Sequence, residues 1–321
     1  MQKDRYYHAA RVVLGEANDT VCQATRSALL DHGFRAIYSA PSAAHVEAAM
    51  NKTDIDLLIC DADLSGRDFC ETVHLARHHK TGENPFVVVI ATTDDPSPAN
   101  VRRILDSGVD DIILKPLRIR PLLERIERQI TERKHFVVTH RYIGPDRRDG
   151  TRKDEAHPIP SIPVPNTLRA TVVNQTNRIR LRELINAVWH QVNEHKMERH
   201  SAQIAWLVER LLPTLRQDII DNVVKERLAL LQETAMELSL RVKSSRFDHV
   251  SGLAVSLIEV ARSLRDCPPP PDRRTIDLLP NLSNAITTAF GSFDKTVKTS
   301  HEISHAVQQH TWPQGKTNLH N

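Results

Sequence analysis

Length, composition and charge narrow the kind of protein. The chain has 321 residues, with 43 basic and 40 acidic side chains and a formal net charge of +3, a balance that does not indicate nucleic acid as a partner. Its four cysteines show no C-x-x-C spacing and lie mostly within apolar segments, which implies no disulfide framework and favours buried free thiols in a reducing compartment. No apolar run approaches the roughly 18 residues of a membrane span, and the N-terminus lacks a secretory signal pattern. We therefore predict a cytoplasmic protein with no membrane partner, and the length predicts two domains.

Short apolar runs alternate with helical patterns over the first 134 residues. The runs lie at 11–15, 34–39, 56–60, 86–92 and 111–115. Segments with helical spacing lie between and after them, at 20–32, 42–51, 68–79, 98–107 and 118–134. Strands this apolar, each followed by a helix, favour a parallel sheet covered on both faces, because right-handed crossovers place helices there. We predict an α/β domain with a doubly wound, five-stranded parallel sheet.

Polar side chains follow several of these strands directly. The stretch "DIDLLICDADLSG" (54–66) places Asp61 at the end of the third run, and Glu16, Thr92 and Lys115 follow the first, fourth and fifth runs. Ligands of open α/β sheets bind outside the carboxyl ends of the strands. Clustered carboxylates suit Mg²⁺, and a carboxylate can attack phosphorus to form an acyl phosphate. The pattern therefore predicts a phospho-aspartate site.

These motifs resemble the receiver domain of bacterial two-component response regulators. The resemblance covers about residues 9–134 and rests on "DLLICDADLSGRD", on "SGVDDIILKP" and on the position of Glu16, 45 residues before Asp61. It implies a flavodoxin-like fold and a signalling protein rather than an enzyme. It also implies that Asp61 accepts a phosphoryl group from a sensor histidine kinase or a phosphotransfer protein.

The resemblance implies roles for the neighbouring residues as well. Lys115 would contact the phosphoryl group, and Thr92 would supply the switch hydroxyl. Glu16, Asp61 and the main-chain carbonyl of Asp63 would hold Mg²⁺.

Three positions depart from the family pattern. Ala17 replaces the second acid after the first strand, so we predict weak Mg²⁺ binding. Ile112 replaces the usual switch aromatic on the fifth strand. Thr92 and Thr93 both lie at the end of the fourth strand; we favour Thr92 and keep Thr93 as the alternative. A phosphorylation-independent pseudo-receiver adaptor is therefore the second hypothesis.

Prolines and glycines interrupt the pattern after residue 134. Residues 135–166 contain five prolines between Pro145 and Pro165, which disfavour regular helix and predict a Pro-rich basic linker. Arg148 and Arg152 match the R-x-x-x-R spacing of cyclic-dinucleotide sites, but no D-x-S-x-x-G follows. A solvated linker is the preferred interpretation.

Apolar residues at spacings of three and four predict an α-helical output or interaction domain over 167–312. We expect Pro213 to separate two helices and Trp189 and Trp206 to be core anchors. No helix-turn-helix pattern is present, so the predicted target is an unknown protein rather than nucleic acid.

Residues 301–305 read "HEISH" and match H-E-x-x-H, in which His301 and His305 would bind zinc and Glu302 would act as the base. The preceding segment is polar, and few residues follow that could supply a third ligand. A zinc hydrolase is therefore the less favoured alternative, and exposed helical histidines are the preferred interpretation.

We conclude from the sequence that phosphorylation of Asp61 would alter the face formed by the helix over 98–107, the strand over 111–115 and the helix over 118–134. A partner or a second copy of the chain would bind there.

Overall fold

The computed structural model describes residues 5–148, 161–174, 176–243, 245–268 and 270–291. The chain divides into two compact units, residues 1–192 and 193–321. Each unit is described by itself.

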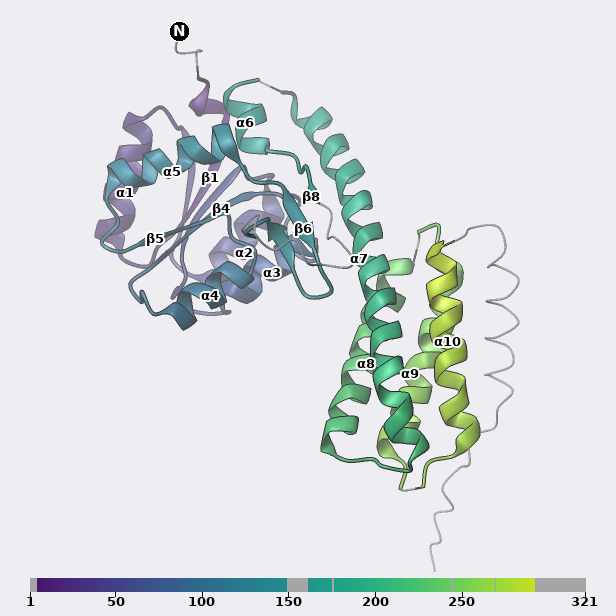
Figure 1. The fold of residues 1–321 in the computed structure, drawn as a ribbon. Coiled ribbons are helices and arrows are strands. Elements are labelled where there is room, and N and C mark those ends of the chain that lie inside the picture. The colour runs from purple at the N-terminus through teal and green to yellow at the C-terminus, as the bar shows by residue number, and fades with distance from the viewer. Residues whose placement is uncertain (1–4, 149–160, 175, 244, 269, 292–321) are drawn as a thin grey trace, which may run out of the picture. The chain divides into compact units, whose positions relative to one another are not determined.

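A five-stranded parallel sheet forms the centre of the first unit (Figure 1). Its strand order is β2-β1-β3-β4-β5, the order of flavodoxin-like doubly wound folds. All five residues of the central strand β3 are buried, because other strands pair with both of its edges and helices cover both faces. The strands are β1 (Arg11–Gly15), β2 (Ala36–Ala40), β3 (Leu57–Asp61), β4 (Val88–Thr93) and β5 (Asp111–Leu114).

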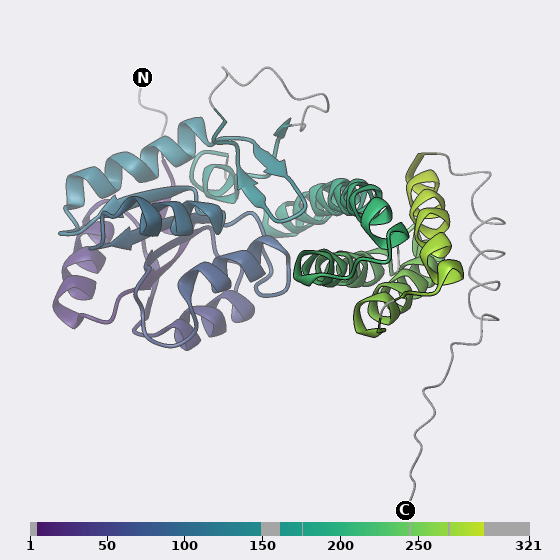
Figure 2. The same cartoon turned by 60° about the horizontal axis from the view of Figure 1, so that its bottom comes forward.

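Helices cover the two faces of this sheet in the way that alternating βα units require (Figure 2). Helices α1 and α5 pack with Leu14, Ile59 and their neighbours on one face. Helices α2, α3 and α4 pack with Val13, Leu58 and their neighbours on the other. The predicted fold class is confirmed. A short 3-10 helix η1 (Tyr7–Ala9) precedes β1, and the helices are α1 (Asp19–Asp31), α2 (Ala43–Lys52), α3 (Phe69–Arg77), α4 (Pro98–Asp106) and α5 (Ile119–Glu132).

The segment after α5 differs from the predicted linker. Its described parts form a small antiparallel sheet in the order β7-β6-β8, with β6 (Phe136–Val138), β7 (Ile143–Pro145) and β8 (Ser161–Ile162). The side chains of Phe136, Ile143 and Ile162 are buried together with Phe86. Prolines prevent a regular helix here, but they do not prevent short strands whose apolar residues find a core.

Apolar and charged contacts attach the next segment, residues 167–178, to the first unit. Helix α6 (Thr167–Val172) buries Leu168 and Val172 in the same cluster as α1 and α5. Arg178, the first residue of α7 (Arg178–Arg216), lies 2.6 Å from the fully buried Asp56. The division of the chain at residue 192 is therefore later than the predicted start of the second domain at residue 167.

The second unit is helical, as predicted. Besides the later part of α7 it contains α8 (Asn222–Val242), the 3-10 helix η2 (Asp248–Val250), α9 (Ser251–Asp266) and α10 (Arg273–Gly291). Leucine, isoleucine, valine and alanine side chains from these helices form one continuous core. Figure 1 and Figure 2 both show α8, α9 and α10 side by side.

Two predictions about this helical region are wrong. Helix α7 continues through Pro213 and ends at Arg216 instead of ending before the proline. Pro213 lies in the last turn of this helix, so it does not separate two helices. Trp206 is 47% exposed, and the guanidinium of Arg210 lies 5.0 Å from the centre of its ring. Trp206 is therefore a surface residue, whereas Trp189 is partly buried against the Phe86 cluster.

Two predicted features lie outside the described residues. These are the HEISH motif, with His301, Glu302 and His305, and position 152 of the R-x-x-x-R motif. Among the described helices, none has the length and apolarity that crossing a membrane would need.

Candidate functional site

Asp61 is the last residue of β3, in the middle of the carboxyl edge of the sheet. Its backbone pairs in register with Thr92 on β4, and Gly15 at the end of β1 pairs with the preceding Cys60. The Asp61 side chain is 11% exposed, so the carboxylate is largely buried and keeps a small solvent-accessible area. One Asp61 oxygen, Oδ1, accepts a hydrogen bond from the backbone N–H of Asp63 at 3.2 Å. The carboxylate is thus held in place by its own loop.

Lys115 brings a positive charge to this carboxylate. Its Nζ lies 2.6 Å from Asp61 Oδ2 and 3.5 Å from Glu16 Oε2. Burial opposes the charged form of Lys115, but the hydrogen bonds and the negative charges of Asp61 and Glu16 outweigh it and raise the pKa of Lys115 above its ordinary value. The lysine is therefore a permanent cation at this site.

Glu16 is buried beside the site, at the start of the loop after β1. Its Oε1 accepts a hydrogen bond from the backbone N–H of Asn18. The side chain of Asn18 in turn caps α1 by accepting from the Val21 N–H, as an N-cap asparagine does. The side chain of Asn18 is therefore used in capping α1, and the side chain of Ala17 has no oxygen that could bind a metal ion. Within the described residues, no group of three or more His, Cys, Asp or Glu side chains is arranged to hold a metal ion.

Gly15 and Cys60 explain how β1 and β3 approach so closely at the site. A Cβ atom on Gly15 would lie 2.5 Å from the Cys60 Sγ, which no real side chain tolerates. Burial raises the pKa of the Cys60 thiol well above its ordinary range, and the charges of Asp61 and Glu16 act in the same direction. Cys60 is thus a neutral packing residue and not a second nucleophile.

The two threonines at the end of β4 face opposite sides of the sheet, because side chains alternate along a strand. Thr93 shares the face of Val89 and Ala91, beneath α2, α3 and α4. Its hydroxyl donates to Asp63 Oδ2 at 3.4 Å and accepts from Asn100 Nδ2 at 3.1 Å and from the Asp95 N–H at 3.2 Å.

Thr92 shares the face of Val88 and Ile90, beneath α1 and α5. The structure therefore joins Thr93, rather than the predicted Thr92, to the residues around α4. The alternation was hidden in the sequence because both faces of β4 are buried.

Asn100 and Asp95 are the site residues that sequence reasoning missed. Both belong to "DDPSPAN", in which Ser97 caps α4 and Pro98 begins it. The capping pattern could have placed Asn100 in the first turn of α4, facing the strand end. On the same side of the sheet Ile112 packs partly buried against the core beneath α4, where the family pattern has an aromatic residue.

An open α/β sheet with a carboxylate, a lysine and a threonine at its carboxyl edge defines a class of signalling domain, and a comparison with family models gives the same result. Residues 12–127 match the family described as response regulator receiver domain. This part of the chain is therefore a response regulator receiver domain, a signalling module of two-component systems. The match does not extend to the helical region, which remains unassigned.

Several solved receiver domains are similar to this one. A CheY-like receiver from Methanospirillum hungatei JF-1 is 23% identical, with a TM-score of 0.34, and the match covers 37% of this chain and 92% of that one. The chemotaxis protein CheY4 of Vibrio cholerae is 21% identical over 37% of this chain and 97% of that chain, with a TM-score of 0.34.

A third similar structure is the receiver domain of the sensor histidine kinase PA1611 from Pseudomonas aeruginosa PAO1, crystallised with a magnesium ion in its active-site cleft. It is 19% identical, with a TM-score of 0.34, and the match covers 37% of this chain and 96% of that chain. The search of curated proteins found no match.

Proposed function

We propose that the protein is a cytoplasmic response regulator that accepts a phosphoryl group on Asp61. The observation that carries this proposal is the 2.6 Å contact between Lys115 Nζ and Asp61 Oδ2 at the carboxyl edge of the sheet. A carboxylate oxygen of Asp61 would attack phosphorus while the bond from phosphorus to the donor's histidine nitrogen breaks. Lys115 would then neutralise an oxygen of the bound phosphoryl group.

We also propose that Mg²⁺ assists at this site and binds weakly. The candidate ligands are oxygens, as Mg²⁺ prefers: Asp61, Glu16 and the main-chain carbonyl of Asp63. Bound Mg²⁺ would offset the negative charge that gathers when a phosphoryl group approaches two carboxylates. Ala17 supplies no carboxylate at the loop position next to Glu16, and this supports low affinity.

Thr93 is our proposed switch hydroxyl, in place of Thr92. It already contacts Asp63 on one side and Asn100 of α4 on the other. A phosphoryl group on Asp61 would compete for the Thr93 hydroxyl and so change the contact with α4. Since Ile112 is not aromatic, the response would pass through α4 itself rather than through a rotating ring.

The proposed partners are a sensor histidine kinase or a phosphotransfer protein as donor, and a protein target of the helical region. A second copy of the chain could bind through the face of α4, β5 and α5. Nucleic acid is not among the proposed partners.

A pseudo-receiver that acts without phosphorylation is the second candidate, and one observation favours it. Ala17 supplies no side-chain oxygen at the loop position next to Glu16, so the carboxylate set that would hold Mg²⁺ for phosphoryl transfer is incomplete. A zinc hydrolase built on His301, Glu302 and His305 concerns residues outside the described ranges, and metal analysis of the purified protein would test it.

Labelling with acetyl phosphate in the presence of Mg²⁺ separates the first two candidates. The proposed regulator forms an acid-labile, base-labile and hydroxylamine-labile phosphoprotein that the Asp61→Asn variant does not form. The absence of label from acetyl phosphate and from any tested phosphorylated kinase would instead favour the adaptor.

A further inference from the structure

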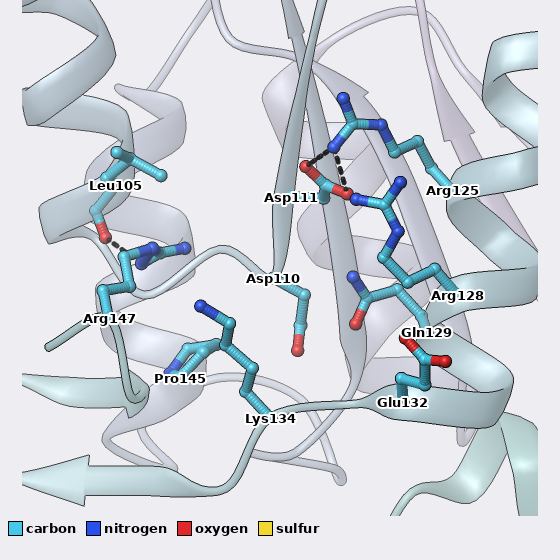
Figure 3. A pocket seen from close by; sticks show the side chains of 10 residues that line it. All are labelled: Leu105, Asp110, Asp111, Arg125, Arg128, Gln129, Glu132, Lys134, Pro145 and Arg147. Carbon is cyan, nitrogen blue, oxygen red and sulfur yellow. Dashed lines mark hydrogen bonds and ion pairs between the residues drawn. The ribbon is translucent and has the colours of Figure 1, made fainter. Parts of the chain in front are cut away.

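A pocket opens on the first unit at the end of the sheet away from Asp61. Its volume is about 340 Å³, enough for a small metabolite. Figure 3 shows Leu105 and Arg147 on one side and the residues of α5 on the other, with Asp110 and Lys134 between them. The lining residues are Leu105, Asp110, Asp111, Arg125, Arg128, Gln129, Glu132, Lys134, Pro145 and Arg147.

Two of the carboxylates in this pocket are already neutralised. Arg125 Nη1 lies 2.9 Å and 3.0 Å from the two carboxylate oxygens of Asp111. Asp110 forms ion pairs with Arg77 at 2.9 Å and with Arg133 at 2.8 Å, two arginines that do not line the pocket. Both acids therefore present little net negative charge to a ligand.

Several hydrogen-bond donors in the pocket are unused. Among the described residues, the guanidinium of Arg128 and the side-chain amide of Gln129 have no hydrogen-bond or ion-pair partner. Within the part of the chain that the structure describes, the ammonium of Lys134 makes no hydrogen bond and interacts electrostatically with Asp146. Gln129 is nevertheless 7% exposed, so its amide is held at the pocket wall and not in free solvent.

Arg147 adds a fourth positive charge. Its guanidinium donates to the backbone oxygens of Leu105 and Val109 and to the Tyr142 hydroxyl, which are neutral acceptors that leave its charge uncompensated. Four cations and three carboxylates line the pocket. Arg77 and Arg133, which pair with Asp110, add two more positive charges next to it. The pocket as a whole therefore attracts anions.

We propose that this pocket binds a small phosphorylated metabolite of about the size of a mononucleotide. Its phosphate would accept hydrogen bonds from Arg128 and Lys134, because phosphate oxygens match the fork of a guanidinium and the charge of an ammonium. Its organic part would lie against Leu105 and Pro145. This site is separate from Asp61, so its failure would leave the proposed phosphorylation unaffected.

Isothermal titration calorimetry on the full chain tests this proposal with AMP, adenosine and inorganic pyrophosphate as probes. We expect AMP to bind and adenosine not to bind. Loss of one charged hydrogen bond in Arg128→Gln should weaken AMP binding about tenfold. Glu132→Gln should have the opposite effect and increase the affinity for AMP. It removes the one carboxylate of the pocket that has no ion-pair partner in the described chain.

The matched control is Arg120→Gln, which removes a 91% exposed arginine on the same helix that is paired with Glu124. Its AMP affinity should equal that of the unchanged protein. The proposal is overturned if AMP does not bind at millimolar concentration, or if adenosine binds as well as AMP. It is also overturned if pyrophosphate binds and AMP does not, or if Arg120→Gln weakens binding as much as Arg128→Gln does.

Discussion

The side-chain amide of Asn100 donates a hydrogen bond to the hydroxyl of Thr93 at 3.1 Å, which ties the last residue of β4 to the first turn of α4. The same hydroxyl donates to Asp63, two residues after the proposed acceptor Asp61. Three segments that are distant in the sequence therefore share one hydroxyl group. Any change at Asp61 that draws this hydroxyl away also releases Asn100 and, with it, the start of α4.

Replacing Thr93 by valine should loosen α4 without unfolding the domain. Valine has the same shape but accepts no hydrogen bond, so Asn100 and the Asp95 N–H each lose a partner, at a net cost of about 1 kcal/mol for each bond. Hydrogen exchange of the α4 amides should become faster. Thr92→Val is the matched control, and exchange that accelerates equally in both variants would contradict the assignment of Thr93.

Replacing Asp61 by asparagine should abolish phosphorylation and leave the fold intact, because an amide of equal shape removes only the nucleophile. The measurement is mobility on a phosphate-affinity gel after treatment with acetyl phosphate and Mg²⁺. Asp63→Asn is a suitable control, since the proposed role of Asp63 in metal binding uses its main-chain carbonyl. Label that persists on Asp61→Asn would move the acceptor to another residue.

Replacing Ala17 by aspartate should tighten Mg²⁺ binding about tenfold or more, because it adds a hard anionic oxygen beside Glu16. Ala17 is exposed, so the change should not disturb the core. Titration calorimetry with MgCl₂ measures the affinity, and Ala17→Asn provides a neutral oxygen for comparison. Equal affinities in all three proteins would mean that position 17 does not face the metal.

Much of the receiver fold was predictable because its signals are local. β1 covers the predicted residues 11–15, and the predicted strand over 56–60 lies one residue from β3. The topology then required Asp61 and Lys115 to meet, since parallel strands end at one edge. The choice between Thr92 and Thr93 was not predictable, because a strand buried on both faces shows no alternation of polar and apolar residues.

The short strands β6, β7 and β8 within residues 135–166 were not predictable, for another reason. Phe136 lies between two arginines, with the guanidinium carbons of Arg77 and Arg133 each 5.1 Å from the centre of its ring. Both arginines also bind Asp110. These contacts join residues 77, 110, 133 and 136, and no local pattern in a proline-rich stretch indicates that they meet.

Phe136→Ala should therefore destabilise the first unit by about 3–5 kcal/mol, the usual cost of removing a buried phenylalanine. A solvated linker would predict almost no effect. Urea unfolding of the full chain, followed by circular dichroism, measures the change. His135→Ala, at the preceding exposed position, is the control. Equal stability of the two variants would restore the linker interpretation.

The last prediction concerns His200, a buried histidine in the helical unit. It is 2% exposed, and its Nε2 lies 3.4 Å from Glu237 Oε2. Burial lowers the pKa of His200 below its ordinary value; Glu237 opposes this shift, whereas the charges of Lys196 and Arg241 support it. The folded state therefore favours the neutral ring.

Because the pKa is lower in the folded than in the unfolded chain, stability should be constant above about pH 6.5 and should fall as the unfolded chain takes up its proton below that pH. The loss cannot exceed about 1.4 kcal/mol per pH unit for one group. Urea unfolding at pH 7 and pH 5.5, read from Trp206 with the other tryptophans replaced by phenylalanine, would measure it. His200→Gln, which is neutral at both pH values, should remove this component of the pH dependence. If the variant loses as much stability between pH 7 and pH 5.5 as the unchanged protein, the buried ring is not the group that titrates.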